Sequence, residues 1–240
     1  MSNRSLITAL VGGGLILGAA GVGVAYFMVF AGASPQKLAL SSPTPTAGDS
    51  PTASASAGTG AGTWTVTSGS QAGYRVREQL ASLAAPSDAV GRTSSITGSV
   101  TITQSGSSYT VAAASLTVNV NTLTSDRAMR DQRLHQMGLE SDRYPTATFV
   151  LTTPIALPAG ATSGQVINVS ATGALTIHGV TKTVTIPIQA RLSGSQIEIA
   201  GSITFPFSEF GMTPPSISGF VSVQDNATME FDIKFAQQGA

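Results

Sequence analysis

Cysteine is absent from the 240-residue chain. Its absence excludes disulfides, thiolate metal sites, a thiol nucleophile and a lipid-modified N-terminal cysteine, so any membrane anchor must be the peptide itself. Charge is also scarce, because Asp, Glu, Lys and Arg make up 10% of the residues and the formal net charge is +0. A chain without an excess of basic residues has no positively charged surface to bind a phosphate backbone. We therefore expect no nucleic-acid partner.

Histidine occurs twice, at His135 and His178, far apart in the sequence. A two-histidine metal site would need them to meet by chance, and we expect no metal site. The carboxylates show no pattern of an acid and base pair, and no G-x-S-x-G nucleophile elbow occurs. We therefore predict no catalytic residues, no cofactor and no enzymatic activity.

Residues 6–30 form an apolar run without a charged residue, preceded by Arg4 in the short N-terminal stretch 1–5. As a helix the run would reach roughly 37 Å, which is enough to cross a ~30 Å hydrocarbon core. We predict a single-pass cell-membrane anchor with a cytoplasmic N-terminus and the remainder outside the cytoplasm. The alternative is a signal peptide cleaved near Ala33, which would give a secreted protein. Glycines within the run would also allow a homodimer.

The stretch 31–62 combines four prolines with Ser, Thr, Ala and Gly. Such a sequence has little apolar surface to offset the entropy lost on ordering. We predict a disordered linker there, a single domain over 63–236 and a short tail over 237–240.

The pattern changes to period two after Trp64, with Thr and Ser alternating against aliphatic residues, as in a sheet with one buried face. The apolar parity switches between Tyr109 and Val120, which predicts a β-bulge near 112–114. Turn signals divide the domain into about eight strands, and no adequate set of amphipathic helices covers the apolar face. We therefore predict an all-β fold, an eight-stranded antiparallel barrel, interrupted by a charged helical or irregular insertion over 125–144.

Three sequence blocks together resemble the YceI-like, polyisoprenoid-binding family. They are Asn121-Thr122-Leu123-Thr124 through Arg130-Asp131-Gln132-Arg133-Leu134 to Tyr144-Pro145-Thr146-Ala147-Thr148-Phe149; Gly173-Ala174-Leu175-Thr176-Ile177-His178-Gly179-Val180-Thr181-Lys182; and Phe207-Ser208-Glu209-Phe210-Gly211-Met212 followed by Val221-Ser222-Val223. The resemblance covers roughly residues 63–236. It implies a lipocalin-like barrel, in a periplasmic or secreted protein, whose apolar bore holds a polyisoprenoid or other long-chain lipid. Where the family commonly shows D-x-H-L, this chain has Asp131-Gln132-Arg133-Leu134.

Strand parity selects candidate residues for lining the bore. They are Leu116, Val118, Phe149, Val169, Leu175, Ile186, Ile188, Ile199, Met229 and Phe231. We place Arg133, Leu134 and Met137 of the insertion at the pocket mouth, where Arg133 would donate hydrogen bonds to a polar ligand head. The predicted function is a membrane-tethered lipid-binding protein of the cell envelope. The alternative is a structural or interaction domain of the envelope whose barrel is filled by its own side chains.

Overall fold

The computed structural model describes residues 34–42, 60–81, 85–215 and 221–237. The chain divides into two compact units, Met1–Pro35 and Gln36–Ala240, and the strands belong to the second. The predicted membrane anchor at 6–30 lies outside the described residues. In the ranges that are described, none of the helices has the length and apolar character needed to cross a membrane.

The second unit is built almost entirely of β-strands. The strands are β1 (Gly62–Val66), β2 (Gln71–Leu80), β3 (Ser87–Thr93), β4 (Ile96–Ser105), β5 (Ser108–Asn119), β6 (Thr146–Leu151), β7 (Ile155–Ala156), β8 (Ile167–Ile177), β9 (Val180–Ser193), β10 (Gln196–Phe205) and β11 (Val221–Gln237). The short helices are the 3-10 helices η1 (Val120–Thr122) and η3 (Phe207–Phe210), the α-helix α2 (Ala128–Arg133) and the π-helix η2 (Leu134–Gly138).

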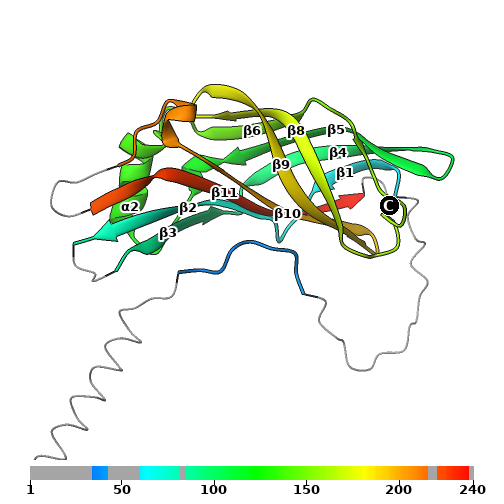
Figure 1. Cartoon of the computed structure of the whole chain (residues 1–240), viewed down its shortest axis with the longest axis horizontal. Coiled ribbons are helices and arrows are strands. Elements are labelled where there is room, and N and C mark those ends of the chain that lie inside the picture. The colour runs from blue at the N-terminus through cyan, green and yellow to red at the C-terminus, as the bar shows by residue number, and fades with distance from the viewer. Residues whose placement is uncertain (1–33, 43–59, 82–84, 216–220, 238–240) are drawn as a thin grey trace, which may run out of the picture. The chain divides into compact units, whose positions relative to one another are not determined.

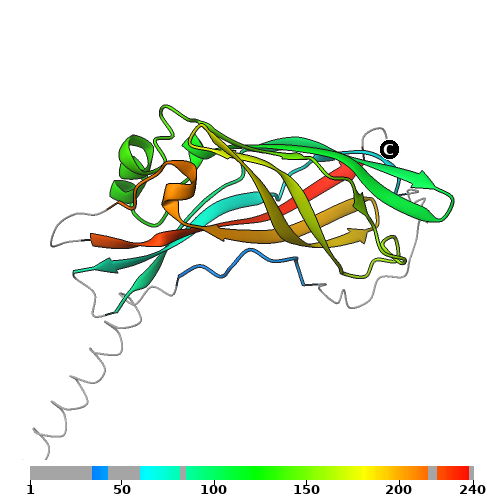
Figure 2. The same ribbon diagram turned by 45° about the horizontal axis from the view of Figure 1, so that its top comes forward.

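Eight strands close into an antiparallel ring in the order β1-β4-β5-β6-β8-β9-β10-β11, and β11 pairs back with β1 (Figures 1 and 2). The predicted eight-stranded antiparallel barrel is confirmed. Outside the ring, β2 pairs with β11 and carries β3, while β7 pairs with β5. Closure leaves one face of each ring strand inside the barrel, which explains the period-two pattern in the sequence.

β1 and β2 follow the same edge of β11 but are separated by a break at residues 67–70. Val66 pairs with Phe235, and the pairing resumes with Gln71 opposite Asp232. The buried Ser70 hydroxyl bridges the break, because its Oγ donates to the Thr67 carbonyl at 2.8 Å and accepts from the Lys234 amide at 2.9 Å. The side chain thus replaces ladder hydrogen bonds that the break interrupts.

A β-bulge lies in β5, where the sequence predicted one. Thr101 of β4 pairs with Ala113, and the next residue, Ile102, pairs with Val111. Ala112 is therefore the extra residue in β5. The bulge lets Val111 and Leu116 both line the barrel interior although one position is odd and the other even.

Two strand glycines make room for aromatic rings inside the barrel. A Cβ at Gly173 would lie 2.5 Å from the ring of Phe149, and a Cβ at Gly201 would lie 2.7 Å from the ring of Phe231. A side chain at either glycine would collide with the ring and also with a backbone carbonyl, that of Val150 at Gly173 and that of Pro187 at Gly201. The period-two pattern identified the aromatic residues as inward facing, but it gave no indication that each ring lies across a neighbouring glycine.

The insertion over 125–144 contains α2 and η2, so the helical part of the prediction is confirmed. Arg130 of α2 bonds to Glu78 of β2 and to Asp126. The Asp131 carboxylate accepts hydrogen bonds from Ser125, at 3.0 Å from its amide and 2.6 Å from its hydroxyl. These contacts hold the insertion against one end of the barrel.

Residues Gln36–Ser42 differ from the disordered linker expected over 31–62. We call them the strap, since they run along the outer face of the barrel as the blue segment of Figure 1. Leu38 and Leu40 are half-buried, whereas Lys37 and Ala39, which each precede one of them, are exposed. This alternation is that of an extended segment lying on a surface, and it supplies apolar contact that the rest of the linker composition does not offer.

Candidate ligand cavity

The barrel encloses a cavity of ≈ 160 Å³ that is lined almost entirely by aliphatic and aromatic side chains. The lining comes from β4, β5 and β6 on one side and from β8, β9, β10 and β11 on the other. Most of these strands contribute alternate residues, because successive side chains of a strand point to opposite faces. The cavity is therefore a direct product of the period-two sequence.

Strand register stacks the lining residues in layers across the barrel. Ala190 of β9 is the partner of Ile167 on one side and of Ile199 on the other, and Ile199 in turn pairs with Ile233. Further along, Phe149 of β6 joins β5 and β8 by pairing with both Leu116 and Leu175. The first layer contains one small residue, Ala190, whereas the second consists of large residues only.

All ten residues selected from strand parity lie along this cavity. They are Leu116, Val118, Phe149, Val169, Leu175, Ile186, Ile188, Ile199, Met229 and Phe231. The selection missed further lining residues, including Ile102, Val111 and Ile197. Each continues the apolar alternation of its own strand segment, so the sequence carried a signal for it. Contact of any of these side chains with a ligand stays a prediction.

One end of the cavity is closed by packed side chains. The lining stops at Ala72, Ala147 and Leu175, all less than 9% exposed. Beyond them the buried rings of Phe205 and Phe210 pack edge to face with centroids 4.7 Å apart. Further buried residues of the same core are Val120, Leu123, Ile177 and Phe207. This end of the barrel is therefore filled from within.

The other end of the cavity reaches the loop between β7 and β8. Leu157 and Thr162 of this loop line the cavity together with Tyr109 and Leu192, and Thr162 is exposed to solvent. The connections nearby, 105–108, 157–166 and 193–196, contain no charged residue. An apolar molecule that entered here would pass uncharged loops, with Arg191 as the one charged residue among the described residues that line the cavity.

The three residues predicted at the pocket mouth do not line the cavity. Leu134 packs against the hydrophobic core at the closed end, Arg133 is half-buried, and Met137 is 63% exposed. The physical reason is that the insertion covers the end filled by phenylalanines rather than an opening. No sequence signal distinguished the two ends of the barrel.

A small polar cluster lies between β2 and the insertion, away from the cavity. The Tyr74 hydroxyl is buried, and this burial raises the pKa of Tyr74 to about 12 although the nearby Arg130 opposes the shift. The phenol therefore stays neutral at physiological pH. Glu78 in the same cluster is paired with Arg130 rather than left as an accessible base.

The two histidines do not meet. His135 Nδ1 contacts the buried hydroxyl of Ser141, whereas His178 Nδ1 lies 3.2 Å from the Phe210 carbonyl. Among the described residues, no group of three or more His, Asp and Glu side chains has the geometry of a metal site. The cavity lining offers dispersion and hydrophobic contact, which suits an apolar ligand.

The model of the YceI-like domain family matches residues 64–235, nearly the whole of the barrel. The chain belongs to the YceI-like family. This match confirms the resemblance found in the three sequence blocks, and its limits fall within one residue of those predicted for the domain. No curated protein matches the chain.

The chain is also similar to solved structures. A polyisoprenoid binding domain from Saccharophagus degradans, implicated in plant cell wall breakdown, has a TM-score of 0.54 and 13% identity over 74% of this chain and 99% of that chain. BcnA of Burkholderia cenocepacia has a TM-score of 0.49 and 20% identity over 67% of this chain and 95% of that chain. At 13% identity the similarity to the Saccharophagus degradans domain shows the fold alone.

Proposed function

We propose that this YceI-like protein binds a polyisoprenoid or other long-chain lipid inside the barrel. The observation that carries the proposal is the bore inside the barrel, whose lining is almost entirely apolar and which opens between uncharged loops. The similarity to a polyisoprenoid binding domain points in the same direction. No catalytic role is proposed.

Burial of an apolar chain in such a bore is favourable without specific polar contacts. Each buried CH₂ group contributes ~0.8 kcal/mol, so a few isoprene units already give a substantial gain. Since the lining has few polar groups, it would select for a slender apolar chain more than for a head group. We therefore expect binding that tolerates different lipids of similar width.

The alternative, a structural or interaction domain with a self-filled barrel, would require native packing throughout the interior. The closed end has such packing, since Phe205 and Phe210 fill it. The remainder of the interior contains the cavity, which supports the lipid-binding hypothesis over the self-filled barrel.

We further propose that residues 6–30 tether the barrel to the cell membrane and that the barrel lies outside the cytoplasm. The uncharged run and the position of Arg4 support this topology, with secretion after cleavage near Ala33 as the alternative. A homodimer formed through the glycines of this segment stays a prediction.

The experiment that tests the proposal starts from membranes of cells that express the full chain. After an alkaline carbonate wash, the protein is purified in mild detergent, and its bound lipids are extracted and identified by mass spectrometry. We expect the chain in the washed membranes, with about one long-chain apolar lipid per barrel. Repeated preparations without lipid that also fail to take up an added long-chain polyprenol would refute lipid binding. Recovery of the chain in the wash would refute the tether instead.

A further inference from the structure

Two carboxylates on the outer face of the barrel are buried. Glu198 of β10 is 5% exposed and Glu230 of β11 is 1% exposed, although neighbouring inward positions such as Ile199 and Phe231 are the ones that line the cavity. Charged residues are rarely buried unless they are paired. Both carboxylates are paired, and the groups that pair with them also hold the strap, Gln36–Ser42.

The first attachment is at Ser41. Its amide and its hydroxyl both donate to Glu198 Oε1, at 3.0 and 2.6 Å. Arg191 Nη2 donates to the Ser41 carbonyl and to Glu198 Oε2, each at 2.7 Å. Burial would raise the pKa of Glu198, but the hydrogen bonds from Ser41 and Arg191 and the charge of Lys234 hold it below its usual range. One charged pair thus binds both polar backbone groups of a single strap residue.

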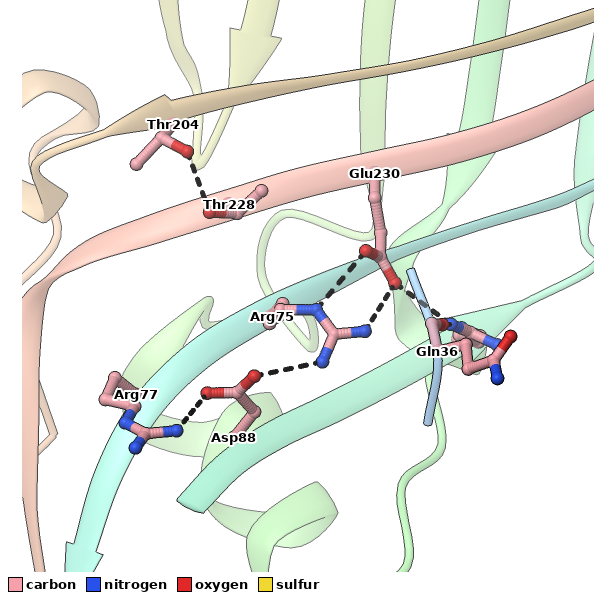
Figure 3. A network of polar contacts seen from close by, with 8 residues as sticks. Gln36, Arg75, Arg77, Asp88, Thr204, Thr228 and Glu230 are labelled. Carbon is pink, nitrogen blue, oxygen red and sulfur yellow. Dashed lines mark hydrogen bonds and ion pairs between the residues drawn. The ribbon is translucent and has the colours of Figure 1, made fainter. Parts of the chain in front are cut away.

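The second attachment is at Gln36, at the other end of the strap. Arg92 of β3 donates from Nη2 to the Gln36 carbonyl and, at 3.1 Å, to Glu230 Oε1 (Figure 3). Glu230 also accepts from Arg75 at 3.4 Å, and Arg75 extends the network to Asp88 at 3.2 Å. A buried carboxylate therefore positions the arginine that holds the strap.

Between the two attachments the strap makes apolar contact with the barrel. Leu38 and Ala39 line a groove together with outward residues of β8, β9 and β10, including Pro187 and Ala200. Ala200 is 4% exposed, although it belongs to the outer face of β10. The outer face thus has a small residue where the strap crosses it and charged residues where the strap is attached.

From this arrangement we infer that the strap is a docking element that shortens the tether of the barrel and fixes the place where the tether leaves it. Its docking follows from the contacts above. Its effect on the tether rests on the proposed function, since it requires residues 6–30 to be anchored in a membrane.

The change in tether length follows from the sequence positions. With the strap docked, residues 31–35 separate the expected anchor from Gln36, and this stretch spans at most ~20 Å. With the strap released, the whole of 31–62 becomes tether, with a root-mean-square length of roughly 30 Å and a maximum of ~110 Å. Docking therefore limits how far the barrel can move from the bilayer.

A neighbouring carboxyl makes this face sensitive to pH. Asp232 Oδ1 is buried without a hydrogen-bond partner in the described part of the chain. Burial and the adjacent Glu198 raise the pKa of Asp232 to about 6, against the opposing charges of Lys234 and Arg191. The folded chain thus holds a proton on Asp232 that the unfolded chain has lost, and stability falls as the pH rises from about 4 through about 6.

We expect Asp232→Asn to remove this loss. The melting temperature of the variant should exceed that of the wild type by about 3 °C above pH 7, and the two should melt together below pH 4. Thermal unfolding of both full chains across this pH range measures the difference. An equal gain at every pH would show that Asp232 does not titrate in this range.

Limited proteolysis with trypsin tests the docking. Lys37 is the sole trypsin site between Arg4 and Arg75, so cleavage after Lys37 reports on the strap directly. The variant Ser41→Pro removes the amide and hydroxyl donors to Glu198 without changing the barrel. We expect the full chain in detergent to be cleaved after Lys37 about tenfold more slowly than this variant.

Ser42→Pro is the matched control, because it introduces the same residue one position further on, at an exposed side chain. It should be cleaved as slowly as the wild type. Glu198→Ala should be cleaved as fast as Ser41→Pro, with thermal unfolding used to verify that its barrel is folded. If Lys37 is cleaved at the same rate in the wild type and in Ser41→Pro, the strap is not docked and the inference fails.

Energy transfer in lipid vesicles tests the effect on the tether. The chain lacks cysteine, so Thr183→Cys on an exposed position of β9 gives a single labelling site, and the acceptor dye is placed on the lipid head groups. Introducing Ser41→Pro into the labelled Thr183→Cys chain is expected to lower the transfer efficiency. Introducing Ser42→Pro into the same chain is expected to leave it unchanged. Equal transfer in all three chains would overturn the effect on the tether. Neither test measures bound lipid, so a failure here is distinguishable from a failure of the lipid-binding proposal.

Discussion

Ala190→Trp is expected to reduce lipid binding by about tenfold or more while leaving the barrel folded. Ala190 lines the cavity in the layer formed with Ile167 and Ile199. An indole at this position would occupy the bore itself, and a filled bore has no room for a chain because protein interiors tolerate little overlap. Since the new side chain enters existing empty space, we expect its effect on stability to be small. Lipid content by mass spectrometry and uptake of a long-chain polyprenol measure the result.

The matched control for this variant is Thr183→Trp, which adds the same side chain to an exposed position of the same strand. It should bind lipid as the wild type does. Unchanged lipid content in a folded Ala190→Trp barrel would place the ligand outside the cavity and contradict the proposed site.

Glu230→Ala is expected to destabilise the barrel by about 3–5 kcal/mol. Glu230 is 1% exposed and accepts from Arg75 at 3.4 Å and from Arg92 at 3.1 Å. Its removal leaves the partly buried guanidinium groups without their shared counter-charge. The resulting decrease in the free energy of unfolding exceeds the one caused by breaking an ordinary surface ion pair. In a domain of this size the melting temperature should fall by on the order of 10 °C, as measured by thermal unfolding of the full chain.

Asp142→Ala removes a carboxylate from an exposed position and serves as the control. Its melting temperature should stay close to that of the wild type, since substitutions at exposed positions usually change stability little. If Glu230→Ala has the same melting temperature as this control, water or other side chains compensate the charges of the two arginines. Glu230 could then not be regarded as a structural centre of the network in Figure 3.

The barrel and the composition of its interior could be predicted because they depend on local periodicity. The alternation from Trp64 onward placed all ten selected side chains along the cavity, and the parity switch located the bulge at Ala112. Both features follow from the geometry of a pleated strand, in which neighbouring side chains point to opposite faces. They need no information about distant parts of the chain.

The features that could not be predicted depend on contacts between distant residues. The open end of the cavity is determined by which end Phe205 and Phe210 fill, and period-two patterns are the same at both ends. The strap was assigned to a disordered linker on composition, since its attachment to Arg92 and Glu198 joins residues more than fifty positions apart. A sequence window that contains only one partner carries no sign of such a contact.

The pairing of β1 with β11 has a consequence for how the chain is made. Trp64 lies opposite Gln237, so the first and last strands of the ring are partners, and β10 and β2 also depend on β11. A ribosome makes β11 after all the other strands of the ring, so the earlier strands cannot complete the ring before β11 is available. Contacts of such high sequence separation form slowly, and the apolar faces of the earlier strands remain uncovered until then. Closure of the barrel therefore has to wait until β11 has been made.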